Sequence, residues 1–163
     1  MKKIIFGCIL VLIIAVSGIL MNLQRNALHL DFITLQGEQL SFEKLRGKSV
    51  LVTFWATDCE NCLKEIPFFI DLYERYHGQG LEIIGVSMYY DPPNHVIEFN
   101  KSHPFPYPIT LDINAEFSNI FGNVKVTPTT FLLNRAGKIV WEKIGLIDKT
   151  ELTHQIEKFL KEK

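Results

Sequence analysis

Residues 53–67, TFWATDCENCLKEIP, decide the fold of this 163-residue chain. They overlap an apolar run, 50–55, which is broken only by Thr53 and is typical of a strand buried on both faces of a sheet. A short polar turn leads to two cysteines, separated by two residues, at a predicted helix start. The helix is expected over about 60–77, and the side chains at helical spacing are Cys62, Leu63, Ile66, Ile70 and Tyr73. The stretch therefore predicts a buried strand that delivers two thiols to a helix.

Apolar runs and turn signals predict the remaining elements outward from this stretch. Before it, residues 30–35 form a peripheral strand or hairpin. After it we expect a buried strand over 81–88, a helix over 92–101 capped by Asp91, a strand over 109–111, a short helix over 115–121, a hairpin of 129–133 and 138–144, and a helix starting at Asp148. This order predicts an α/β fold whose central mixed sheet has helices on both faces and an antiparallel edge.

The N-terminus carries a membrane-directing segment, in which Lys2 and Lys3 precede an apolar run over 4–23. A helix needs about 20 such residues to cross the hydrocarbon core, and the lysines favour a cytoplasmic N-terminus with an exported body. A signal peptide cleaved near 15–17 is one interpretation, whereas an uncleaved anchor, which we favour, explains why the run continues to Leu23. We expect residues 1–24 to be an anchor or signal segment and residues 25–163 to be one domain.

The three cysteines divide between these two parts. Cys8 lies in the apolar segment and is interpreted as a packing residue. Cys59 and Cys62 lie in the exported part, where thiol pairs form disulfides. At the helix start, unpaired amides and the helix dipole stabilise a thiolate, so Cys59 is the predicted nucleophile and Cys62 the resolving thiol. A purely structural disulfide satisfies the same count, whereas a zinc site needs about four ligands and the chain has no second CxxC motif.

The motif FWATDCENC, the following Lys64-Glu65-Ile66-Pro67 and the later Val126–Phe131 stretch, VTPTTF, resemble the thioredoxin superfamily, and within it the membrane-tethered TlpA/ResA-like thiol-disulfide oxidoreductases. The resemblance implies that Pro128 is a cis-proline facing the cysteines and that the Thr127 backbone pairs with an extended substrate. Trp55 is expected to flank the site and, with Thr127 and Pro128, to bind substrate. It also implies a helix and a strand inserted within about 91–121, between the CxxC helix and the cis-proline strand. From the residues alone, Pro128 equally suits an ordinary loop.

Glu65 follows Cys62 by three residues, which places it beside that cysteine on the helix. Buried acids titrate high, so such a glutamate can exchange protons with the cysteine pair, the role that the resemblance assigns to this position. The alternative is an exposed residue on the helix surface. Where plain thioredoxin has a buried aspartate before its cysteines, this chain has Thr53.

Two positions depart from the family pattern, because Asp58 stands where an aromatic residue often precedes the first cysteine and Asn61 where proline often precedes the second. Asp58 and Glu60 place negative charge beside Cys59, which opposes thiolate formation and favours the disulfide form. This charge predicts a low potential and therefore a reductant.

The sequence thus predicts an extracytoplasmic thiol-disulfide oxidoreductase that reduces disulfides in exported proteins, with apocytochrome c, and hence cytochrome c maturation, as a candidate client and pathway implied by the resemblance. We expect it at the outer face of the bacterial inner membrane, or in the periplasm if the segment is cleaved. Electrons come from a membrane dithiol donor, since no nucleotide-binding glycine motif is present. We expect a monomer with no cofactor, no metal and no nucleic acid partner, given a formal charge of -1. The alternatives are a dithiol oxidase and a Cu(I)-binding module.

Overall fold

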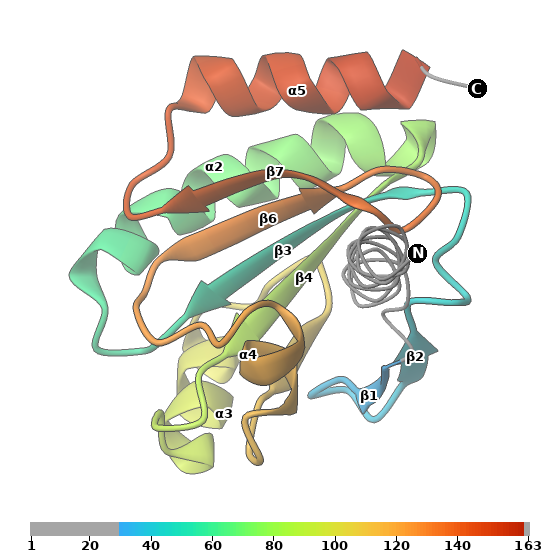
Figure 1. Cartoon of the computed structure of the whole chain (residues 1–163). Coiled ribbons are helices and arrows are strands. Elements are labelled where there is room, and N and C mark those ends of the chain that lie inside the picture. Colours follow the sequence, from blue (N-terminus) through green and yellow to red (C-terminus); the bar gives the residue numbers. More distant parts are fainter. Residues whose placement is uncertain (1–29, 162–163) are drawn as a thin grey trace, which may run out of the picture.

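The computed structural model describes residues 30–161, which form a five-stranded mixed sheet in the order β5-β4-β3-β6-β7 (Figure 1). The central strand is β3 (Ser49–Trp55), and all seven of its residues are buried. It pairs in parallel with β4 (Leu81–Ser87), which pairs in parallel with β5 (Ile109–Leu111). On its other side it pairs antiparallel with β6 (Thr129–Leu133), and β7 (Ile139–Ile144) is the antiparallel edge. The predicted sheet is confirmed.

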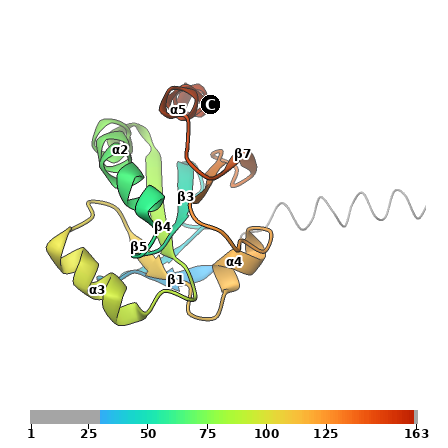
Figure 2. The ribbon, with the colours of Figure 1, turned by 90° about the vertical axis from the view of Figure 1, so that its left-hand side faces the viewer.

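Helices cover both faces of this sheet, as Figure 2 shows in a view along its edge. The elements outside the sheet are α2 (Glu60–Tyr76), the short 3-10 helix η1 (His77–Gln79), α3 (Pro93–Ser102), α4 (Glu116–Ile120), α5 (Lys149–Lys161), and the hairpin of β1 (Asp31–Ile33) and β2 (Gln39–Ser41). One core packs α2, α3 and α5 against the sheet, and the other packs α4 and the hairpin against the opposite face. The predicted insertion between α2 and β6 includes α3 and β5.

The side chains of β3 alternate between the two cores, because successive side chains of a strand point to opposite sides of the sheet. Leu51 and Trp55 belong to the core under α2, whereas Val52 and Phe54 belong to the core under α4. The second core is built around phenylalanine rings with centroids 5.0 to 6.3 Å apart: Phe32, Phe42, Phe54, Phe117, Phe121 and Phe131. Helix α2, which carries the cysteine pair, therefore packs on the face of the sheet opposite this phenylalanine cluster.

The buried face of α2 differs from the predicted stripe. Its fully buried residues are Cys62, Glu65, Phe69, Leu72 and Tyr76, whereas the predicted Leu63, Ile66, Ile70 and Tyr73 are only half-buried at its borders. The predicted stripe is correct at Cys62, and its other members pack at the border of the core, about one position from the buried face. Glu65 belongs to the buried face because its carboxyl finds a backbone donor inside the protein.

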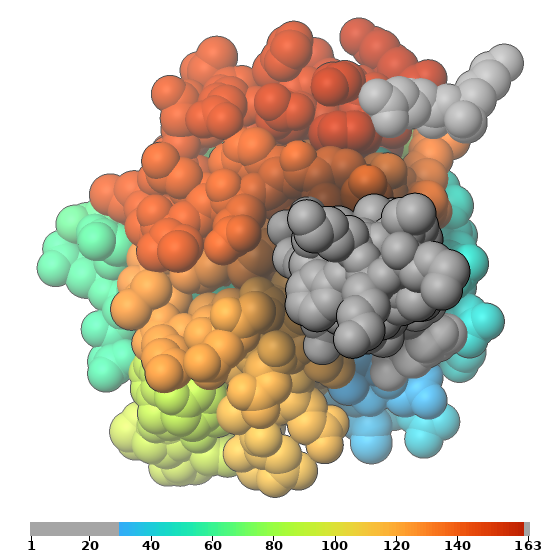
Figure 3. Space-filling view, in the orientation of Figure 1, coloured from blue at the N-terminus to red at the C-terminus, as the bar shows by residue number. Residues whose placement is uncertain are grey.

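In the face shown in Figure 3, the start of α2 lies at one edge, and β7 and α5 cover the upper part. The predicted anchor over residues 4–23, and Cys8 within it, lie outside the described residues. Among residues 30–161, no helix combines the length and the apolarity that crossing a membrane requires.

Candidate active site

The two cysteines lie where β3 gives way to α2. Cys59 is the N-cap residue of the helix, and its Sγ accepts a hydrogen bond from the Cys62 N–H at 3.2 Å. The Cys59 N–H donates to the Ala56 carbonyl at 3.1 Å, which closes the turn between strand and helix. The two sulfurs are bonded at 2.02 Å. Cys59 is half-buried and Cys62 is only 3% exposed, so an incoming sulfur meets Cys59 first.

Glu65 points into the protein one turn beyond Cys62, and it is 3% exposed. Its Oε1 accepts the N–H of Ile147 at 2.8 Å, and its Oε2 has no hydrogen-bond partner among residues 30–161. Burial raises the pKa of Glu65, and the Ile147 N–H and the charge of Lys149 oppose that increase. The expectation of a buried acid is confirmed, and the alternative of an exposed helix-surface residue is wrong. Sequence reasoning missed Ile147, whose backbone donor leaves no side-chain signal.

Glu65 and Cys62 line a common small cavity of about 10 Å³, together with Thr53 and a wall of aromatic rings that includes Trp55 and Tyr107. A space of this size holds one water molecule at most. Thr53 receives a hydrogen bond from the hydroxyl of Thr130 at 3.2 Å. The acid and the resolving cysteine therefore line one small space among largely buried side chains.

Trp55 lies behind the cysteine pair and not on the surface, since it is 4% exposed. Its ring packs against Phe99 and Phe105 with centroids 5.5 and 5.3 Å away. Gly85 of β4 makes room for it: a Cβ there would lie 3.3 Å from the Trp55 Nε1 and 2.5 Å from the Cδ1 of Ile109. The expectation that Trp55 contacts substrate does not fit this burial, because its ring is covered by the insertion.

The segment before β6 carries the predicted proline. The Thr127–Pro128 peptide bond is cis, so the ordinary loop interpretation is wrong. Since Phe54 pairs with Thr129, Pro128 lies beside the end of the strand that leads to Cys59. The Pro128 carbonyl accepts the Gly145 N–H at 2.8 Å. Within residues 30–161, neither the N–H nor the carbonyl of Thr127 has a hydrogen-bond partner, so both remain available.

Asp91 contributes to the site in a way that sequence reasoning missed. The predicted helix cap is wrong, because the N-cap of α3 is Pro92 and no side chain caps that helix. Instead, the buried Asp91 carboxyl accepts the N–H and the hydroxyl of Thr57, both at 2.7 Å. An acidic residue shortly after a buried parallel strand was the available signal, because such positions lie at the same sheet edge as the cysteines. Asp91 thus ties the insertion to the loop before Cys59.

The net negative charge around Cys59 is smaller than the sequence indicated, because one of the two acidic residues has a basic partner. Glu60 forms an ion pair with Lys64 at 2.7 Å, and this contact lowers the pKa of Glu60. Both partners are exposed, so solvent screens the pair. Asp58 is also exposed and has no ion-pair partner in the described part of the chain. The net negative charge beside Cys59 therefore comes mainly from Asp58.

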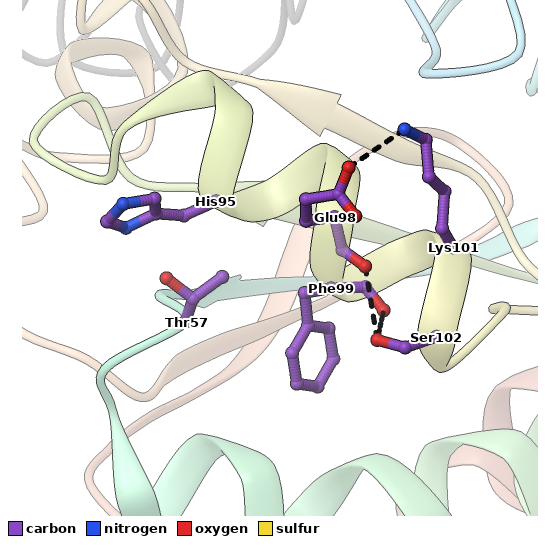
Figure 4. A pocket seen from close by; sticks show the side chains of 6 residues that line it. All are labelled: Thr57, His95, Glu98, Phe99, Lys101 and Ser102. Atoms are coloured by element: carbon purple, nitrogen blue, oxygen red, sulfur yellow. Dashed lines mark hydrogen bonds and ion pairs between the residues drawn. The ribbon is translucent and has the colours of Figure 1, made fainter.

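An open groove of about 610 Å³ runs between α3 and the loop that precedes Cys59 (Figure 4). Thr57 faces it from that loop, and α3 contributes the other lining residues: His95, Glu98, Phe99, Lys101 and Ser102. Glu98 and Lys101 pair with each other at 2.9 Å. Over residues 30–161, no three His, Cys, Asp or Glu side chains are placed to hold a metal ion.

A cysteine pair capping a helix, a cis-proline beside it and a mixed sheet covered on both faces define a thioredoxin-like thiol-disulfide oxidoreductase. The chain belongs to the Redoxin family, whose model matches residues 24–158. A thiol-disulfide oxidoreductase ResA from Geobacillus thermodenitrificans is 33% identical over 129 residues, covering 78% of this chain and 73% of that protein.

A second ResA, from Bacillus thuringiensis, is 29% identical and covers 85% of this chain and 79% of its own length. The crystal structure of StoA from Bacillus subtilis superposes with a TM-score of 0.67 at 28% identity, covering 77% of this chain and 93% of that one. The resemblance to ResA-like thiol-disulfide oxidoreductases that was inferred from the two motifs is confirmed.

Proposed function

We propose that this thiol-disulfide oxidoreductase works as an extracytoplasmic reductant of disulfides in exported proteins, held at the membrane by its N-terminal segment. The observation that carries the exchange chemistry is the cavity shared by Cys62 and Glu65, because it pairs the resolving thiol with an acid of raised pKa. The apolar run over 4–23 supports the tether and the exported location. Apocytochrome c is the candidate client, and a membrane dithiol is the candidate electron donor.

The proposed cycle starts from the reduced protein. The Cys59 thiolate attacks one sulfur of the client disulfide, and the other client sulfur leaves as a thiolate that takes up a proton. Glu65, as a carboxylate, accepts the Cys62 proton, and the Cys62 thiolate then attacks the Cys59 sulfur and releases the second client thiolate. Two electrons pass from the protein to the client, whose two thiolates take up protons from solvent, and the Cys62 proton stays on Glu65. A donor dithiol then reduces the disulfide, becoming a disulfide itself and losing its two protons to solvent, and Glu65 returns its proton to the Cys62 thiolate.

The client backbone is held by Thr127, whose N–H and carbonyl are available for pairing with an extended chain. Pro128 forms the wall beside the strand that leads to the cysteines. Trp55 supports the pair from inside, because its burial removes it from the client surface. These roles for Cys59, Cys62, Glu65, Thr127 and Pro128 are the ones that the resemblance implies.

A trapping experiment tests the proposal. In the Cys62→Ala variant the mixed disulfide through Cys59 is not resolved, so client proteins should accumulate on the variant in the native membrane fraction, and mass spectrometry identifies them. The Cys59→Ala variant is the matched control, because it lacks the attacking sulfur. An absence of Cys59-linked clients would contradict the exchange function.

The direction of exchange is tested by the reduction potential. Asp58 beside Cys59 supports the disulfide form, so we expect a value near the reducing end of the range, about -270 mV. A value near the oxidising end, about -120 mV, would identify the protein as an oxidase that introduces disulfides.

A further inference from the structure

Two adjacent tyrosines lie half in solvent in the loop between β4 and α3. Tyr89 and Tyr90 are each 45% exposed, and their rings meet edge to face with centroids 5.3 Å apart. Val126, in the segment before β6, is 53% exposed. The reaction cycle uses none of these side chains, and no charged residue is among them.

The position of the tyrosine pair is fixed from two sides. The hydroxyl of Tyr90 lies 3.3 Å from the Oγ1 of Thr127, the residue before Pro128. The next residue, Asp91, holds Thr57 through two hydrogen bonds of 2.7 Å, and Thr57 lies two positions before Cys59. The pair therefore lies between the loop that carries the nucleophile and the backbone that pairs with the client.

We propose that Tyr89, Tyr90 and Val126 form a specificity surface that contacts an apolar client side chain within two residues of the reacting client cysteine. This inference rests on the proposed function, in which an extended client pairs with Thr127. Side chains of an extended chain alternate between two sides, so the residues that flank the client cysteine extend over the neighbouring surface. Exposed tyrosines offer large, rigid contact area at a low loss of conformational entropy, a property of strong contact residues.

The probe reaction separates contact with the peptide from the chemistry at sulfur. Each probe is a five-residue peptide whose central cysteine is joined to thionitrobenzoate, with either leucine or serine at the four flanking positions. Cys59 attacks this mixed disulfide, coloured thionitrobenzoate leaves as a thiolate, and Cys62 then displaces the peptide thiol as the protein disulfide forms. Two electrons move from the protein dithiol to the probe. Dithiobis-nitrobenzoate, which has no peptide, is the small reference substrate.

Rates are measured by stopped flow with the reduced full-length protein and with its Tyr89→Ala, Tyr90→Ala and Tyr90→Phe variants. We expect the native protein to prefer the leucine peptide, and each alanine variant to lose roughly three- to tenfold of its rate on that peptide. The rates on the serine peptide and on dithiobis-nitrobenzoate should stay unchanged. Tyr90→Phe should keep the preference, because the ring remains and only the hydroxyl contact with Thr127 is lost. Ile33→Ala, on exposed β1, is the matched control for loss of a surface apolar group.

Equal rates on the leucine and serine peptides in the native protein would overturn the inference. So would alanine variants that slow dithiobis-nitrobenzoate as much as the leucine peptide, since that pattern means a disturbed cysteine pair. Either result leaves the proposed exchange function standing. A native protein that fails to react with dithiobis-nitrobenzoate would instead overturn the proposed function, and the inference with it.

Discussion

Asp112 and Glu65 are both buried carboxylic acids, 2% and 3% exposed, but their surroundings differ. Asp112 accepts the N–H groups of Phe117 and Ser118, each at 2.9 Å, and the Ser118 hydroxyl, at the start of α4. Glu65 accepts a single N–H, from Ile147, beside the resolving cysteine. A carboxyl group that accepts several donors is held in one place as a structural group, whereas burial with a single donor raises the pKa of Glu65. The number of donors therefore separates a structural acid from a chemical one.

The largest expected effect is on the structural side of this comparison. Asp112→Ala removes the acceptor for two buried amides and one hydroxyl, so we expect it to lower the free energy of unfolding by roughly 2–4 kcal/mol. Denaturant unfolding measures the loss. The reduction potential should not change, since the donors that Asp112 holds belong to α4, which packs on the face of the sheet opposite the cysteine helix; a changed potential would contradict the assignment.

Variants of Asp91 test whether an acid with several hydrogen bonds can also position the loop before Cys59. Asp91→Ala leaves the N–H and hydroxyl of Thr57 without their acceptor and should lower the free energy of unfolding by about 1–3 kcal/mol. It should also slow thiol-disulfide exchange, because the loop before Cys59 loosens. Asp91→Asn keeps one acceptor oxygen and should restore part of both losses. Hydrogen exchange at the Thr57 amide reports the loosening directly, and unchanged protection would count against it.

Glu65→Gln tests the proton-exchanging acid through pH. Burial raises the folded pKa of Glu65 above its ordinary value of 4.5, so the folded state binds more protons than the unfolded state between those two values. The contribution of Glu65 to stability therefore falls as pH rises through that window and is least unfavourable below pH 4.5.

As the pH rises from 4 to 7, the native protein should lose stability relative to the Gln variant, because the native protein loses the contribution of protonated Glu65 and the Gln variant has no such group. The pH profile of exchange should also lose the step that belongs to Glu65. Thermal unfolding and exchange rates at matched pH values measure both, and parallel pH profiles for the two proteins would refute the assignment.

The smallest effect is expected from the exposed acids beside Cys59. Asp58→Asn should raise the reduction potential by less than about 30 mV, a tenfold change in the exchange equilibrium, because solvent screens the charge. Glu60→Gln should raise it even less, since Lys64 already pairs with Glu60. Equilibration with glutathione measures both shifts. A larger shift for Glu60 than for Asp58 would contradict this order.

Much of the fold could be predicted because its signals are local. The apolar run 50–55, the hairpin turn before β7 and the Asp148 side chain at the start of α5 each set their own element, and Asp148 does accept the N–H groups of Thr150 and Glu151. The spacing of Cys59 and Cys62 placed both thiols at one helix start. The place of Glu65 in the buried face of α2 could not be predicted in this way, because its hydrogen-bond donor, the Ile147 N–H, lies 82 positions away in the sequence.

The sequence by itself determined the order of strands and helices, the two thiols and their chemistry, since periodicity and motif spacing act over a few residues. Only the tertiary structure decided which acids matter and how. Glu65 became a buried acid with one donor, Asp91 became the anchor of the Thr57 loop, and Trp55, expected to bind substrate, became a support behind the cysteine pair. The physical reason is that burial and hydrogen-bond partners come from segments far apart in the chain, and these set the proton affinity and exposure of each group.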